Sequence, residues 1–156
     1  MKVEKIVATI LVTFSTLTAC THLGERDYFE EMNNERRTVE DSISIGKIDF
    51  AQKAIDEKLR TAKDSDSYYL WLSTKNRKNF YLADAKGMEE VNNRIGKYLS
   101  KKVKESESRK WVEAEYYMSK SVYFISFRWT PDSALAYNSM ALKKLDAVKG
   151  AEDHKL

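Results

Sequence analysis

The sequence predicts an all-α protein of about six helices arranged as three antiparallel hairpins. One proline and five glycines in 156 residues are too few turn residues for a sheet protein of this size. Apolar residues recur every three or four positions through most of the chain after residue 27, which is the period of a helix. The clusters "DSDS" (64–67), "ESES" (105–108) and "TPDS" (130–133) interrupt this pattern and supply residues that begin helices.

The first twenty residues have the organisation of a bacterial export signal. Lys2 and Lys5 precede an uncharged run over residues 6–17, which is too short to cross a bilayer core of ~30 Å. The run ends in Leu17-Thr18-Ala19-Cys20, which resembles the lipobox of bacterial lipoproteins. This resemblance implies lipid on Cys20 and cleavage just before it. A plain secretory signal or a buried free cysteine is the alternative.

A lipoprotein signal sets the expected domain boundaries and location. Cys20 is the only cysteine, so it cannot form an intramolecular disulfide, whereas lipid attachment needs one thiol. We expect residues 1–19 to be cleaved and residues 20–27 to form the lipidated cysteine and a tether. In lipoproteins an aspartate after the cysteine favours retention in the inner membrane, and Thr21 stands there instead. The resemblance therefore implies a lipid anchor in the outer membrane, with the protein facing the periplasm.

The first four helices are predicted from their apolar spacing within a single domain over residues 28–149. We expect helices over 28–44 with a frayed end at Ser42–Ile45, over 49–63, over 68–87 with a possible break near Asn76, and over 88–103. In the second helix the shared face is formed by Ala51, Ile55, Leu59 and Ala62. In the fourth helix it is formed by Met88, Val91, Ile95, Leu99 and Val103.

The last two helices are predicted over residues 109–129 and from Pro131 onward. The fifth is apolar on most sides, so we expect it to be central. Thr130 and Pro131 are predicted as N-cap and first helical residue of the sixth, and Gly150 follows its end before a tail over 150–156. The expected seam of the fifth helix is Trp111, Ala114, Met118, Val122, Ile125 and Trp129, and that of the sixth is Leu135, Ala141, Leu142, Leu145 and Val148.

A pattern recurs in three helices, as Ala51-x3-Ile55-x2-Lys58-Leu59, Val91-x3-Ile95-x2-Tyr98-Leu99 and Ala134-x3-Asn138-x2-Ala141-Leu142. It predicts hairpins over 26–63, 67–104 and 108–148. The pattern resembles the second helix of tetratricopeptide repeats. The stretch "AEYYMSKSVYFISFRWTPDSALAYNSMALKKL" (114–145) also resembles outer-membrane assembly lipoproteins related to BamD. A tetratricopeptide-like stack and an irregular helical bundle are both compatible with these observations.

Catalytic and metal sites are not predicted by the sequence. His22 and His154 are the only histidines, and they lie far apart in the predicted tether and tail. The pairs Glu89/Glu90 and Glu113/Glu115 diverge around a helix, so we expect them on solvated faces. A formal net charge of +3 does not favour nucleic acid as a partner. We therefore expect no cofactor, no metal and no catalytic residue.

The aromatic residues are the most informative candidates for binding. The sequence has nine tyrosines, six phenylalanines and three tryptophans, and one helix cannot bury all the rings that the fifth carries. We expect Trp111, Phe124 and Trp129 in the core. Tyr and Trp are favoured at protein interfaces, so the candidate partner-binding residues are Tyr68, Trp71, Tyr116, Tyr117, Tyr123 and Phe127.

The predicted function is that of a membrane-anchored, non-enzymatic adaptor or envelope assembly factor that binds a protein partner at the cell envelope. A periplasmic inhibitor or immunity protein is the alternative, and an envelope hydrolase is a third possibility. A hydrolase would bring two carboxylates from distant segments together.

Overall fold

The computed structural model describes residues 28–148, and all regular secondary structure in this range is helical. The predicted all-α class with about six helices is confirmed for these residues. The predictions for residues 1–27 and for the tail, including lipidation of Cys20, concern residues outside the described range. The α-helices are residues 28–44, α2 (Ile48–Thr61), α3 (Ser65–Tyr81), α4 (Ala85–Leu99), α5 (Glu107–Tyr123) and α6 (Pro131–Leu145), with a π-helical turn, η1 (Phe124–Arg128), between the last two.

The chain divides into two compact units, Met1–Glu35 and Arg36–Leu156. Residues 28–35 are the described part of the first unit, and they are helical. The second unit contains helical residues 36–44 and the helices α2 to α6. The division of the chain into a tether and one domain over 28–149 stays a prediction.

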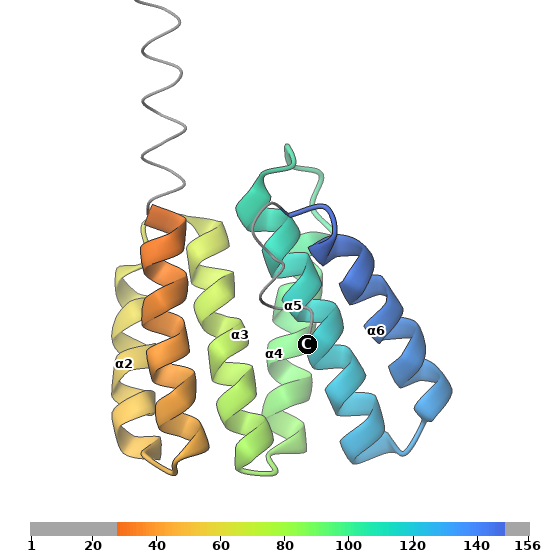
Figure 1. Ribbon diagram of the computed structural model, residues 1–156, viewed down its shortest axis with the longest axis horizontal. Helices are drawn as coiled ribbons and strands as arrows, with labels where there is room; N and C mark the ends of the chain where they lie inside the picture. The colour runs from red at the N-terminus through yellow and green to blue at the C-terminus, as the bar shows by residue number, and fades with distance from the viewer. Residues whose placement is uncertain (1–27, 149–156) are drawn as a thin grey trace, which may run out of the picture. The chain divides into compact units, whose positions relative to one another are not determined.

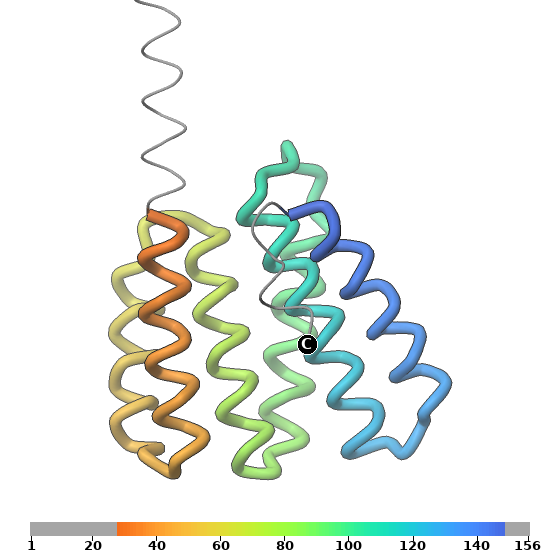
Figure 2. Tube along the Cα trace, viewed as in Figure 1, coloured from red at the N-terminus to blue at the C-terminus, as the bar shows by residue number. Residues whose placement is uncertain are grey.

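Within the second unit, consecutive helices run antiparallel (Figure 1; Figure 2). α2 packs on α3, and α3 packs on both α4 and α5. α5 contacts α3, α4 and α6, as expected of a central helix. The centre is closely packed because these helices supply side chains with no exposed surface, among them Ile55, Leu70, Leu72, Ile95, Val112 and Ala114.

The predicted start signals begin three of the helices. Asp64 accepts a hydrogen bond from the Ser67 N–H at 2.8 Å, and Ser106 accepts one from the Arg109 N–H at 3.0 Å. Such an N-cap contributes about 1 kcal/mol. Pro131 is the first residue of α6, as predicted, but the Thr130 side chain forms no capping hydrogen bond.

α3 runs without a break through Asn76, so the possible interruption there does not occur. The polar residues in the middle of α3 face the interior, because α4 and α5 cover them. Asn76 is 1% exposed, and its Nδ2 donates to Asn92 Oδ1 of α4 at 2.9 Å and to Ser119 Oγ of α5. The polar stretch is therefore a buried face of the helix.

Several residues expected in the apolar seams are exposed. Val103 lies beyond the end of α4, and Leu135 and Leu142 lie on the outer face of α6. Ile125 and Trp129 lie in and just after η1. A π-helical turn is wider than an α-helical turn, so these two residues do not continue the seam of α5. The expectation of a buried Trp129 is wrong.

Candidate functional site

Eight aromatic rings form a continuous row along α5 and across to the end of α3, which we call the aromatic belt. Neighbouring ring centroids lie 5.4–6.4 Å apart, within the range of favourable ring pairs. The belt runs, in spatial order, through Tyr116, Tyr117, Tyr137, Phe124, Tyr123, Phe127, Phe80 and Tyr81.

Two cations lie over the belt. Lys120 Nζ is 5.0 Å from the Phe124 centroid and 5.4 Å from that of Tyr137. Arg128 lies 5.5 Å from the Tyr123 centroid, and its Nε donates to Tyr123 Oη at 3.0 Å. Tyr123 Oη donates in turn to Glu89 Oε2 at 3.1 Å. Cation–π and hydrogen-bond contacts therefore fix the orientation of these rings.

Tyr116 and Tyr117, at the first end of the belt, are half-buried. Burial raises the pKa of Tyr116 above its usual range, and burial together with Glu113 raises the pKa of Tyr117. Glu113 also forms an ion pair with Lys144 of α6 at 2.8 Å. A Cβ atom on Gly96 would lie 2.9 Å from Tyr116 Oη, so the absence of a side chain in α4 makes room for this ring.

The other end of the belt consists of Phe80, Tyr81 and Phe127. We use the name belt end for these three residues together with the exposed residues next to them along the chain, Leu82, Ile125 and Trp129. The contact between Phe80 and Phe127, with centroids 6.4 Å apart, joins the end of α3 to η1. Trp129 is 82% exposed and has φ 52° and ψ 39°. Ala83, in the link after α3, also has a positive φ of 53°. An exposed ring on a left-handed backbone distinguishes Trp129 from the other aromatic residues.

The structure separates the six predicted binding residues into different places. Tyr116, Tyr117, Tyr123 and Phe127 belong to the belt. Trp71 and Tyr123 are 3% and 5% exposed, which leaves little of either ring for a partner, and Trp71 lies outside the belt. Tyr68 lies in a second cluster, in which Tyr69 stacks on Tyr98 with centroids 4.0 Å apart.

Sequence reasoning did not assign Phe80, Tyr81, Tyr137 or Trp129 to the surface site. Phe80 and Tyr81 are more than forty positions away from η1 along the chain, and only tertiary packing brings them together. The exposure of Trp129 could have been inferred from its position immediately before the helix start "TPDS", because a residue between two helices does not continue the buried seam of either helix.

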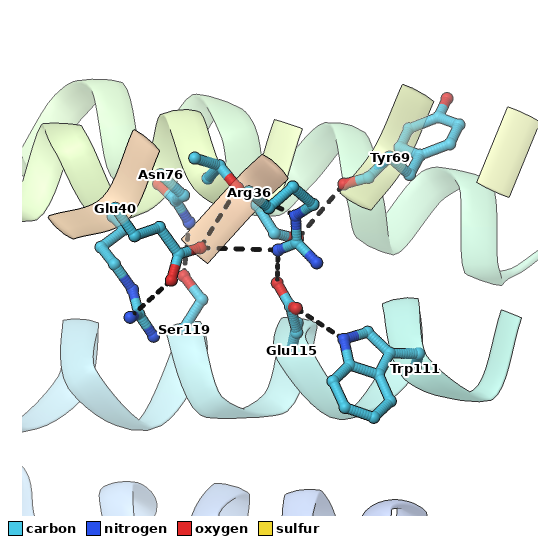
Figure 3. A network of polar contacts seen from close by, with 10 residues as sticks. Arg36, Glu40, Tyr69, Asn76, Trp111, Glu115 and Ser119 are labelled. Carbon is cyan, nitrogen blue, oxygen red and sulfur yellow. Dashed lines mark hydrogen bonds and ion pairs between the residues drawn. The ribbon is translucent and has the colours of Figure 1, made fainter. Parts of the chain in front are cut away.

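A buried ionic network within the second unit connects Arg36 and Glu40 to α3 and α5 (Figure 3). The Arg36 side chain is 4% exposed, and its Nη2 lies 2.5 Å from Glu115 Oε2. Its Nε donates to Thr74 Oγ1 at 3.0 Å, and Trp111 Nε1 donates to Glu115 Oε1 at 2.7 Å. Glu40 lies 3.7 Å from Arg36 and 2.7 Å from Arg77.

The pKa values of the two carboxylates in this network shift in opposite directions. Burial raises the pKa of Glu40 above its usual value, although Arg36 and Arg77 oppose the shift. Burial would also raise the pKa of Glu115, but the charge of Arg36 and its hydrogen bond outweigh this and hold it below its usual value. Glu113 and Glu115 diverge as predicted, but both are paired within the protein, so the expected solvated face is wrong for them.

The site therefore offers aromatic faces, apolar side chains and charged groups that are paired with one another. Such surfaces bind apolar side chains by burial and stacking. Among residues 28–148, no group of three or more metal-ligating side chains is placed to hold an ion. No helix in this described range is long and apolar enough to span a membrane.

Comparisons with known proteins identify no relative: no family model, no curated protein and no solved structure matches this chain.

Proposed function

We propose that this chain is a lipid-anchored protein of the bacterial envelope that binds a protein partner through the belt end, as an adaptor or assembly factor without catalytic activity. The observation that carries the proposal is the exposure of Tyr81, at one end of a continuous row of packed rings, together with that of Trp129, which directly follows η1. Tryptophan and tyrosine are the residues that most often dominate the free energy of binding at interfaces.

The belt end is suited to a protein partner because Phe80, Tyr81 and Phe127 already pack on other rings before binding. Phe127 packs on both Tyr123 and Phe80, and Tyr123 is fixed by Arg128 and Glu89. Side chains that are already ordered lose little entropy on association, which favours affinity. We expect the partner to contribute apolar side chains to this surface.

The lipid anchor would complete this function. Each buried CH₂ of an acyl chain contributes ~0.8 kcal/mol to membrane binding, so a multiply acylated Cys20 would hold the belt end close to the membrane. This raises the effective concentration of the surface where an envelope partner is assembled. The lipobox supports the anchor, and the weak resemblance to BamD-related lipoproteins supports an assembly role.

The test is capture of envelope proteins from a detergent extract by the full lipidated chain. The double variant Trp129→Ala/Tyr81→Ala removes two exposed rings, and we expect it to weaken binding of the captured protein at least about thirtyfold, since a hot spot contributes 2 kcal/mol or more. Val103→Ala is the matched control, because Val103 is exposed outside the belt end, and it should bind as the unchanged chain does.

Tyr68→Ala distinguishes the second aromatic cluster from the belt end. Loss of binding in Tyr68→Ala, with binding retained in Trp129→Ala/Tyr81→Ala, would place the surface at Tyr68 and contradict the proposal. Circular dichroism of each variant verifies that the helices are intact. Capture of a toxin or hydrolase whose activity is then blocked would favour an inhibitor or immunity protein instead.

A further inference from the structure

A buried pair of side-chain amides joins α3 to α4. Asn76 of α3 and Asn92 of α4 are 1% and 2% exposed. The Nδ2 group of Asn76 donates to Asn92 Oδ1 at 2.9 Å and also donates to Ser119 Oγ of α5. One helical turn from each asparagine lies an apolar residue with no exposed surface, Leu72 before Asn76 and Ile95 after Asn92. The amide pair is therefore a polar contact enclosed within the core of the second unit.

Each amide of this pair carries one buried atom that no protein group satisfies. Among residues 28–148, neither Asn76 Oδ1 nor Asn92 Nδ2 forms a hydrogen bond. The first atom is an acceptor and the second is a donor. Buried polar side-chain atoms are nearly always hydrogen-bonded, because an unpaired one loses its hydration without compensation. The amide pair therefore requires a further group that both donates and accepts.

Rotating the amides by half a turn does not remove this requirement. Such a rotation exchanges the oxygen and the nitrogen of an asparagine side chain. If only one amide is rotated, two oxygens or two nitrogens face each other at 2.9 Å. If both are rotated, Asn92 Nδ2 donates to Asn76 Oδ1, and the unpaired atoms become Asn76 Nδ2 and Asn92 Oδ1. Both consistent orientations therefore leave one donor and one acceptor unpaired.

We propose that water binds beside the Asn76–Asn92 amide pair, between α3, α4 and α5. A water molecule donates and accepts at the same time, so it satisfies the unpaired atoms in either orientation of the amides. Water buried in proteins typically forms about three hydrogen bonds to polar groups of this kind. The two amides are uncharged and enclosed, which favours water over an ion, because burying an unpaired ion is far more costly. The proposal goes beyond binding at the belt end and does not depend on it.

Magnetic cross-relaxation between water and the side-chain amides of the full chain tests the site. The chain carries isotope-labelled asparagine, and rotating-frame spectra separate contact with bound water from proton exchange. We expect a contact signal between water and the NH₂ group of Asn92, or that of Asn76 if both amides are rotated. Asn93 is the matched control, because it is exposed on α4 and its hydration water exchanges rapidly. A lack of signal at both buried amides would overturn the proposal.

Relaxation dispersion of isotope-labelled water counts long-lived internal water molecules without relying on the amide signals. Asn76→Leu/Asn92→Leu replaces both amides with apolar side chains of similar size, a change that proteins often tolerate. We expect this variant to lose the contribution of at least one long-lived water, whereas Asn93→Leu should retain it. An unchanged contribution in a double variant with intact circular dichroism would overturn the proposal. If the double variant does not fold, the amide signals of the unchanged chain decide the question.

Discussion

Trp129 combines an unfavourable backbone conformation with an indole ring that the fold does not bury. A left-handed conformation costs an L-residue about 1–2 kcal/mol, and the ring is 82% exposed, so packing offsets little of this cost. The backbone is held by the Trp129 N–H, which donates to the Phe124 carbonyl, and by the Thr130 N–H, which donates to the same oxygen at 3.2 Å. Strained residues of this kind concentrate at functional sites.

Replacing Trp129 with glycine should therefore separate stability from binding. Trp129→Gly removes the left-handed penalty, and we expect it to be about 1 kcal/mol more stable than Trp129→Ala, which keeps the strain without the ring. Urea unfolding followed by circular dichroism measures the difference, and both variants should lose the captured partner. Equal or lower stability of the glycine variant would show that the backbone at residue 129 is unstrained.

At the scale of the helices, the network around Arg36 fixes how three elements meet. Arg36 comes from the first helix, Thr74 from α3, and Glu115 from α5. A buried ion pair contributes little net stability compared with apolar residues of the same size, but removing one partner leaves an uncompensated charge. The helices must therefore pack so that Arg36 and Glu115 stay paired, because any other arrangement would leave a buried charge without a partner.

Glu115→Gln and Glu40→Gln should alter stability with opposite dependence on pH. Glu115 has a lowered pKa, so the stability from its ionisation is present above pH 4.5, the usual value, and is lost as pH falls through the lowered pKa. Glu40 has a raised pKa, so the unchanged chain loses stability relative to Glu40→Gln as pH rises from 4.5 through the raised value.

Urea unfolding between pH 3 and pH 7 measures both effects. At pH 7 we expect Glu115→Gln to lose about 2 kcal/mol, less than the 3–5 kcal/mol typical of a fully buried pair, because the Glu115 side chain is 21% exposed. Glu40→Gln should be neutral or slightly stabilised at that pH. Parallel pH profiles for the two variants would show that the carboxylates share one environment.

At the scale of the whole molecule, the fold gathers rings from α3, α5, η1 and α6 into one belt, while the predicted lipobox lies in the first 27 residues. The proposed anchor and the proposed binding surface thus belong to separate parts of the sequence. Removing the anchor should change the location of the protein and leave the belt end intact.

Cys20→Ala tests the anchor. The unchanged chain should be found in the outer-membrane fraction, with residues 1–19 absent and a lipid mass on Cys20. We expect Cys20→Ala to lack the lipid and to accumulate as the uncleaved precursor. Thr21→Asp is the matched control, which should keep the lipid and move to the inner membrane. Mass spectrometry of the fractions provides the measurement, and cleavage at another position would instead indicate a plain secretory signal.

The sequence by itself determined the all-α class, the approximate positions of the helices and the start signals of α3, α5 and α6. The ends were less accurate, because α3 ends at Tyr81 and α4 begins at Ala85, whereas the predicted junction followed Gly87. These features depend on contacts within a few residues, such as the bond from the Ser67 N–H to Asp64 or the fixed φ of Pro131. They can be read from the sequence because both partners are close along the chain. Four members of the belt could be named for the same reason, since they lie together on α5 and η1.

Only the tertiary structure decided which face of each helix is covered. Periodicity indicates which residues share a face, but a neighbouring helix determines whether that face is buried. The polar face of α3 at Asn76 is covered by α4 and α5, and Glu115 is matched by Arg36 from a distant helix. Leu135 of α6, which was expected in an apolar seam, is exposed because none of the described helices covers it. Burial depends on long-range packing, which the local pattern alone does not determine.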